Sequence, residues 1–293
     1  MSTGRPLVTI GIPVFNGAPR IASALESAVA QTYPNLAVVV SDNGSDDETP
    51  AICERIASNA GNVMFHAAAE NRGATWNFNN VFLQSEGEYF KWMGHDDLLD
   101  PTTIDKAVTA LEADPDLAIA HWLERIVNDE GSVLREYGPE QGFEVHGTNA
   151  ATRFRQMLDW RRHGYAGDPI YGVIRRGALE KTRLLSNMHN PNYLLLEELA
   201  AVGGITTIPD LLSTRVYNDV RVTTKKLLTW LDPSSDRRYP HFERAREHFR
   251  IGLASSQGMV GERIRTLGVL IRYHMAPREL KGFAWDVREN LRR

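Results

Sequence analysis

The chain has 293 residues, of which 42% are hydrophobic and 24% are charged, and its net charge at pH 7 is −4. This composition is typical of a globular protein with one large α/β domain or two modest ones, and it gives no indication of a nucleic-acid partner. The single cysteine, Cys53, excludes an internal disulfide and a cysteine-based metal site. No apolar run approaches the roughly 18–20 residues that span a bilayer, and no signal peptide precedes the first strand, so we expect a cytoplasmic protein.

Short apolar strands and amphipathic helices alternate through residues 7–101. The spacing predicts strands over 7–12, 36–40, 63–66 and 89–93, with helices over 21–29, 51–58 and 74–84 between them. This alternation is typical of repeated βαβ units. We therefore expect an α/β fold with a mostly parallel sheet flanked by helices.

After residue 101 the pattern is less regular. It predicts a helix that ends at 113, strands over 117–122, 170–174, 205–208 and 211–216, helices over 150–161 and 193–202, and an irregular segment over 132–147. The end of the chain is helical and basic, and over 237–293 Lys and Arg outnumber Asp and Glu by 13 to 6. We expect one α/β domain over 1–232 and a helical C-terminal extension over 233–293.

A pair of adjacent acids follows the strand expected over 89–93. The strand breaks at Gly94, and His95, Asp96 and Asp97 come directly after it. In an open α/β sheet this edge is where ligands bind, and two buried carboxylates are costly unless a positive group lies against them. Mg²⁺ or Mn²⁺ shared with a diphosphate is a suitable partner, because such an ion takes one or two carboxylates and completes its shell with phosphate oxygens and water. A solvated turn whose acids cap the next helix is the alternative.

Five segments of the chain stand in a recognisable order and spacing. They are Val8-Thr-Ile-Gly-Ile-Pro-Val-Phe-Asn-Gly17, Gln31-Thr-Tyr-Pro-Asn35, Val40-Ser-Asp-Asn-Gly-Ser-Asp-Asp-Glu-Thr49, Asn71-Arg-Gly73 and Gly94-His-Asp-Asp-Leu-Leu-Asp-Pro101. Together they resemble the motifs of the family 2 glycosyltransferases, strongly over 7–101 and weakly over 165–218. The resemblance implies a GT-A fold with a Rossmann-like sheet, a nucleotide-binding half over about 1–101 and an acceptor half over about 102–232. It also implies an inverting, metal-dependent hexosyltransferase.

The resemblance further implies which residues bind the nucleotide sugar: Pro13, Phe15, Asn16, Asp42, Asn43, Arg72, Asp96 and Arg221. Asp42 corresponds to the acid that accepts the N3 hydrogen of uracil or a similar base, and Asn43 stands where many members have a second Asp. Gly17 imposes no Cβ where the backbone approaches the base. A local Asx-turn is the alternative role for Asp42, and a surface position is the alternative for Arg72.

The metal ligands implied by the resemblance are Asp97, Asp96 and Asn218, with Asp96 also lying against the ribose or donor sugar. The upstream acid of the D-x-D pattern falls on Gly94, which departs from the family. Many relatives carry a histidine near Asn218, whose oxygen is a weaker ligand. Arg221 lies where many such enzymes close a loop over the diphosphate.

The general base is left unassigned. Family members usually have an Asp or Glu before the late apolar helix, but Asn192 falls at that position, and an amide cannot accept the proton. Glu197 or Glu198 reaches the position if the register shifts, and Asp168 and His189 are further candidates.

The implied reaction moves a sugar from a nucleoside-diphosphate sugar, with a UDP-sugar favoured, to a hydroxyl of a saccharide, a lipid-linked or another glycoconjugate acceptor. Three roles stay open for the C-terminal extension: packing on the catalytic domain, homodimer formation, and peripheral contact with the inner face of a membrane. The departures at Gly94, Asn192 and Asn218 also leave open a catalytically impaired relative that binds nucleotide sugar or scaffolds polysaccharide assembly. A dinucleotide-dependent dehydrogenase is excluded because residues 11–17 lack the G-x-G-x-x-G pattern.

Overall fold

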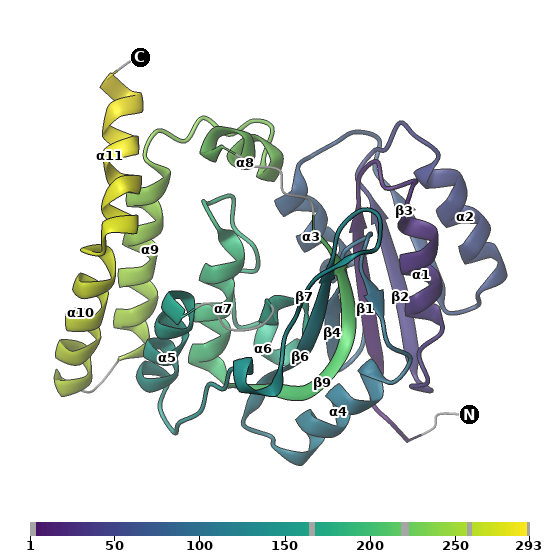
Figure 1. Cartoon of the computed structure of the whole chain (residues 1–293), viewed down its shortest axis with the longest axis horizontal. Helices are drawn as coiled ribbons and strands as arrows, with labels where there is room; N and C mark the ends of the chain where they lie inside the picture. The colour runs from purple at the N-terminus through teal and green to yellow at the C-terminus, as the bar shows by residue number, and fades with distance from the viewer. Residues whose placement is uncertain (1–3, 164–167, 218–222, 257–259, 292–293) are drawn as a thin grey trace.

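The computed structural model describes residues 4–163, 168–217, 223–256 and 260–291 (Figure 1). In this part of the chain the strands form one curled sheet in the order β3-β2-β1-β4-β8-β6-β9-β5, with β7 paired to β6. The strands are β1 Val8–Val14, β2 Leu36–Asp42, β3 Val63–Ala67, β4 Tyr89–Trp92, β5 Leu98–Leu99, β6 Leu117–Val127, β7 Val133–Glu136, β8 Val173–Arg175 and β9 Gly204–Val216. The α-helices are α1 Ile21–Val29, α2 Thr49–Asn59, α3 Ala74–Leu83, α4 Thr103–Ala113, α5 Ala150–His163, α6 Arg176–Leu179, α7 Pro191–Val202, α8 Thr224–Leu231, α9 Pro240–Ser255, α10 Val260–His274 and α11 Pro277–Leu291.

The amino-terminal half of the sheet is parallel, as the alternation of strands and helices predicts. β1 pairs in parallel with β2 and β4, and β2 pairs in parallel with β3. Helices α1 and α2 cover one face of this half and α3 covers the other, so its central strands are buried on both faces. Helix α4 belongs to the same core as α1 and α2 but packs against β6, β8 and β9. The carboxyl ends of β1, β2 and β4 therefore meet at one edge, where the loops that follow them lie together.

The carboxyl-terminal half of the sheet is mixed. β8 pairs antiparallel with β4 and β6, whereas β6 and β9 are parallel. The strand predicted over 170–174 is instead a 3-10 turn, Pro169–Tyr171, followed by the shorter β8. Proline favours the first position of such a turn, and it has no N–H to donate to a neighbouring strand.

Strand β9 corrects the prediction of two separate strands over 205–208 and 211–216. It is one strand that pairs with β6 on both sides of two bulged residues, Pro209 and Asp210. The sequence does not indicate that β9 continues through the bulge, because proline and aspartate are residues that normally end a strand. The segment expected to be irregular, 132–147, also contains β7.

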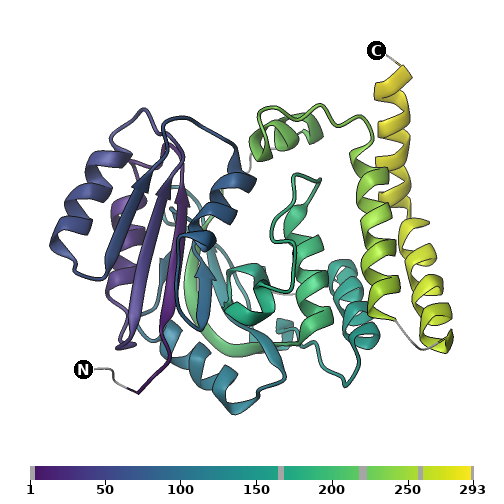
Figure 2. The ribbon, with the colours of Figure 1, turned by 180° about the vertical axis from the view of Figure 1, so that it is seen from behind.

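Helices α9, α10 and α11 lie beside the sheet domain (Figure 2). α9 packs against α5 and α7, and both α10 and α11 pack against α9. Arg244 of α9 and Glu279 of α11 form a buried ion pair, and Asp286 of α11 accepts hydrogen bonds of 3.0 Å from the N–H groups of His241 and Phe242 at the start of α9. We propose residues 1–232 as the catalytic unit and 233–293 as its extension. None of the described helices combines the length and the apolar composition that crossing a membrane requires.

Candidate active site

The loop after β4 turns sharply at Gly94 and presents His95, Asp96 and Asp97. The N–H of Asp97 donates to the carbonyl of Gly94 across 3.3 Å. A Cβ atom at position 94 would lie 2.7 Å from Oδ2 of Asp97 and 3.1 Å from Oδ1 of Asp96. Any side chain here, including the further acid of the D-x-D pattern, would displace both carboxylates. Glycine at position 94 therefore lets the acid pair fold back over the loop without a shift of either carboxylate.

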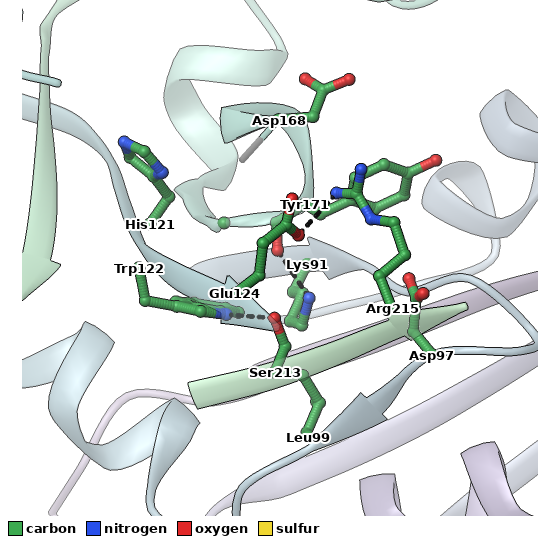
Figure 3. Close-up of a pocket in the computed structure, with 11 residues that line it drawn as sticks. Lys91, Asp97, Leu99, His121, Trp122, Glu124, Asp168, Tyr171, Ser213 and Arg215 are labelled. Carbon is green, nitrogen blue, oxygen red and sulfur yellow. Dashed lines mark hydrogen bonds and ion pairs between the residues drawn. The ribbon is translucent and has the colours of Figure 1, made fainter. Parts of the chain in front are cut away.

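Asp97 lines a narrow pocket beneath this loop (Figure 3). Its Oδ1 atom is enclosed and has no hydrogen-bond partner among the described residues. Burial raises the pKa of Asp97, Arg215 opposes that rise, and Asp96 adds to it. The other charged groups that line the pocket are Lys91, Glu124, Asp168 and Arg215.

The cations of this pocket already have partners. Nη2 of Arg215, on β9, lies 2.9 Å from Oε2 of Glu124 on β6, and the guanidinium carbon lies 5.1 Å above the centre of the Tyr171 ring. Nζ of Lys91, on β4, donates to the carbonyls of Trp92 at 3.0 Å and of Tyr171 at 2.5 Å. Burial lowers the pKa of Lys91 to about 7 and raises that of Glu124 to about 6. Carboxylates thus outnumber the available positive charge, which favours binding of a cation beside the acid pair.

Asp168 and Asn192 lie side by side although they are far apart in sequence: Asp168 lines the narrow pocket, and both residues line an adjoining pocket of about 200 Å³. Oδ2 of Asp168 accepts a 2.7 Å hydrogen bond from Nδ2 of Asn192, at the start of α7. Burial raises the pKa of Asp168, while Arg215 and the hydrogen bond from Asn192 oppose the rise. Asn192 thus holds the carboxylate of Asp168 beside the start of α7.

A wider pocket of about 280 Å³ opens at the carboxyl ends of β1 and β2, on the side of Asp96. It brings together four residues that the sequence predicts for nucleotide-sugar binding: Pro13, Phe15, Asn43 and Asp96. Tyr171 lines both this pocket and the narrow one, so the two are neighbours. Trp230 of α8 and Phe78 of α3 add aromatic surface to its wall.

Asn43 ties this pocket to the turn at 71–73. Its Nδ2 donates to Oδ1 of Asn71 at 3.0 Å and to the carbonyl of Gly73 at 3.1 Å, and its Oδ1 accepts from the N–H of Arg72 at 3.0 Å. A carboxylate cannot donate the first two bonds, which explains the amide at this position. The guanidinium carbon of Arg72 lies 4.3 Å above the Trp76 ring, and Arg72 lines neither pocket.

The remaining residues of the first two loops are held by local contacts. Asp42 is buried and accepts hydrogen bonds from the N–H and hydroxyl groups of Ser45, three residues on, so the carboxylate is held by a local contact within its own loop. Nδ2 of Asn16 donates to Asp46 at 2.8 Å. A Cβ atom on Gly17 would lie 2.7 Å from Cδ2 of His95. Gly17 therefore makes room for His95, a reason that the sequence did not suggest.

The two acids of α7 are not positioned to act as the base, which corrects that expectation. Oε1 of Glu197 lies 3.5 Å from Nε2 of His248 in α9, and both side chains are fully buried. Oε1 of Glu198 lies 2.7 Å from Nε of Arg183 and 2.8 Å from Nη2 of Arg250. Both carboxylates are thus engaged away from the acid pair. Asn218 and Arg221, predicted as a metal ligand and a diphosphate contact, fall outside the described residues.

Residues 9–183 match the model of the family described as Glycosyl transferase family 2. The chain belongs to this family. An uncharacterized glycosyltransferase of Rickettsia felis is 34% identical over 145 residues, which are 49% of this chain and 24% of that protein. A second, from Rickettsia typhi, is 40% identical over 110 residues, 38% of this chain and 33% of that one. The chondroitin synthase of Escherichia coli is 30% identical over 129 residues, 44% of this chain and 19% of the synthase. This family 2 glycosyltransferase thus covers 33% or less of the length of these relatives.

Solved structures confirm the GT-A type fold. Residues 1–349 of S. aureus TarS, in complex with UDP-GlcNAc, match with a TM-score of 0.70 at 16% identity, over 96% of this glycosyltransferase and 79% of the TarS chain. The mannosyltransferase PcManGT from Pyrobaculum calidifontis, in complex with GDP-Man and Mn²⁺, matches with a TM-score of 0.59 at 20% identity, over 98% and 75% of the two chains.

The acid pair of this family 2 glycosyltransferase fits a hard divalent cation. The enclosed, unpartnered Oδ1 atom of Asp97 is the type of oxygen that Mg²⁺ or Mn²⁺ binds. Among the described residues no group of three or more His, Cys, Asp or Glu is placed to hold a metal ion. Asp96 and Asp97 would therefore hold the cation only when phosphate oxygens and water complete its shell.

Three charged residues of the narrow pocket were not predicted as site residues: Lys91, Glu124 and Arg215. Each lies on a strand of the sheet. Lys91 stands between Phe90 and Trp92 in the sequence, is 2% exposed, and places its Nζ atom 4.8 Å from the centre of the Trp122 ring. A charged residue inside an apolar strand is rarely buried without a partner, so this pattern is the signal that could have found Lys91.

Proposed function

We propose that this protein transfers a sugar from a nucleoside-diphosphate sugar, with a UDP-sugar favoured, to a hydroxyl group of a saccharide, lipid-linked or other glycoconjugate acceptor, with inversion at the anomeric carbon. The observation that supports this most is the placement of carboxylates around two neighbouring pockets that share Tyr171. Asp96 lines the wider pocket, and Asp97 and Asp168 line the narrow one. The family membership sets the class of reaction, and the UDP-GlcNAc and GDP-Man complexes of similar structures support a nucleotide-sugar donor.

The donor is proposed to lie along the carboxyl ends of β1, β2 and β4. The nucleotide would occupy the wider pocket, which Phe15 and Asn43 line, with the diphosphate directed toward Asp96. Asp42 ends β2 directly before Asn43. A divalent cation, when bound, neutralises charge on the diphosphate leaving group as a Lewis acid. Burial raises the pKa of Asp97, and the guanidinium of Arg215 favours the ionised carboxylate by opposing that rise.

Asp168 is proposed as the general base. The acceptor oxygen attacks the anomeric carbon from the face opposite the diphosphate, and the bond from that carbon to the diphosphate oxygen breaks, so the configuration inverts and the nucleoside diphosphate leaves. Asp168 takes the proton of the acceptor hydroxyl as the new bond forms. The raised pKa of Asp168 brings it nearer the operating pH, which suits a base. Asn192 is a positioning residue that fixes Oδ2 of Asp168 through its 2.7 Å hydrogen bond. With a buried carboxylate beside Asn192, the departure at position 192 no longer favours an impaired protein.

The test is a thermal-shift panel of UDP-, GDP-, CMP- and dTDP-sugars, with and without Mn²⁺, followed by donor hydrolysis for the best ligand. A bound ligand raises the melting temperature by mass action. We expect the Mn²⁺-dependent part of the shift to vanish in Asp97→Asn and to persist in Glu54→Gln, an exposed acid on α2. An unchanged shift in Asp97→Asn would remove the proposed role of this carboxylate. Mn²⁺-dependent binding without any hydrolysis would favour a scaffold over an enzyme.

A further inference from the structure

Large apolar side chains are exposed along the last two helices. They are Val260, Ile264, Ile271 and Met275 at α10, and Leu280, Val287 and Leu291 on α11, with exposed fractions from 42% to 82%. The spacings of four and seven residues place each set on one side of its helix. Isolated exposed apolar residues need no explanation, but two such rows on consecutive helices indicate a surface that contacts something.

The charges of the same helices are sorted by sign. Every Lys and Arg of residues 260–291 is exposed: Arg263, Arg265, Arg272, Arg278, Lys281 and Arg288. The acids Glu262, Glu279 and Asp286 are buried. Glu289 is half-buried. The outer surface of α10 and α11 is therefore apolar and cationic at once.

The buried acids have partners within the protein, which fixes how the helices are turned. Glu262 accepts from Arg155 of α5 at 2.6 Å, Glu279 pairs with Arg244 of α9, and Asp286 caps the start of α9. These contacts hold the acidic side of each helix against the rest of the molecule. α10 and α11 follow one another along the outer edge, and α9 lies between α11 and the sheet domain (Figures 1 and 2).

We propose that the outer surface of α10 and α11 binds the surface of a membrane that contains anionic phospholipids. Apolar rows flanked by Lys and Arg are the pattern of helices that lie in the plane of a bilayer interface, where the apolar side chains enter the headgroup region and the cations contact anionic lipids. The surface stands apart from the proposed transfer reaction, because none of its residues lines the pockets around the acid pair.

A second copy of the chain is a poorer partner for this surface. A two-fold contact would bring the same exposed cations together, and no exposed acid of these helices opposes them. The apolar rows also span only about two heptads in each helix, which is shorter than the three to four heptads that indicate a coiled coil.

The experiment is flotation of the full chain with vesicles of phosphatidylcholine alone and with vesicles that also contain phosphatidylglycerol. We expect binding only to the anionic vesicles, with an affinity that falls as salt is added. Lys281→Gln with Arg288→Gln should weaken binding about 30-fold, since each cation near an anionic surface contributes roughly fivefold. Ile264→Ser with Ile271→Ser should weaken it more than about tenfold. The matched control is Met64→Ser with Leu83→Ser, which removes exposed apolar side chains elsewhere and should bind as the parent does.

Three outcomes would overturn the proposal. One is failure of the parent chain to bind anionic vesicles, and another is binding that both surface variants retain. The third combines two results. Analytical ultracentrifugation in lipid-free solution would show that the parent chain is a dimer and that Ile264→Ser with Ile271→Ser is a monomer, and neither the parent nor this variant would bind vesicles. All the substituted side chains are exposed, and unchanged circular dichroism would show that the variants are folded.

Discussion

Replacing Asn192 by alanine should shift the pH dependence of turnover toward higher pH. Asn192 donates a 2.7 Å hydrogen bond to Asp168, and this bond lowers the pKa of the carboxyl against the effect of burial. A hydrogen bond to a charged group is worth about 1.5–3 kcal/mol. The loss of this hydrogen bond removes that stabilisation from the ionised carboxylate and should therefore raise the pKa of Asp168 further.

The direction of this shift in the pH dependence follows from the role of Asp168 as the base. A base accepts a proton only when it is ionised. A variant in which Asp168 has a higher pKa therefore loses activity at a higher pH when the solution is acidified. The assay is the rate of UDP release from a UDP-sugar as a function of pH, at saturating donor, for the parent and for Asn192→Ala. Asn59→Ala is the matched control, since its amide donates a 2.8 Å hydrogen bond to the Arg55 carbonyl on α2, far from the site in sequence. If the rate of UDP release of a folded Asn192→Ala variant fell at the same acidic pH as that of the parent, the assignment of Asp168 as the base would be refuted.

Three further substitutions test other parts of the structure. Gly94→Asp should lose Mn²⁺-dependent donor binding in the thermal-shift assay, because a Cβ atom at 94 would lie 2.7 Å from Oδ2 of Asp97; stronger Mn²⁺ binding would contradict the geometry. Glu198→Gln should keep full activity and lose about 1 kcal/mol or less of stability in urea, because its arginine partners are half-exposed. Arg215→Leu should lose about 3 kcal/mol or more in the same measurement, since it leaves Glu124 buried without its partner. Glu124→Gln added to Arg215→Leu should recover much of that loss, and a double variant no more stable than the single one would count against a charge effect.

The parallel half of the sheet could be predicted because its information is local. Each strand from Val8 to Trp92 is a short apolar run closed by turn residues, and each helix between them carries its own apolar face. β9 could not be predicted as one strand, because its continuity past Pro209 and Asp210 comes from pairing with β6, which lies far away in the sequence. Tertiary pairing overrides the local signal there.

The site residues also divide into those that local sequence indicates and those that depend on contacts between distant segments. Asp96 and Asp97 could be found because they are adjacent and end a strand, so one stretch of sequence contains the whole signal. The pair of Asp168 and Asn192 joins a 3-10 turn to the start of α7, and the pair of Glu124 and Arg215 joins two strands. The sequence of one segment alone does not indicate its contact with the other. A search for an acid at position 192 therefore could not identify Asp168, the carboxylate that lies against Asn192.

The most direct test of the acid pair is crystallographic. Crystals grown with Mn²⁺ and UDP-GlcNAc would be measured at the manganese absorption edge, so that anomalous density locates the metal. We expect a peak in contact with Oδ1 of Asp97 that also touches the diphosphate oxygens. Clear density for the nucleotide with the metal absent from Asp97, or bound elsewhere, would contradict the account.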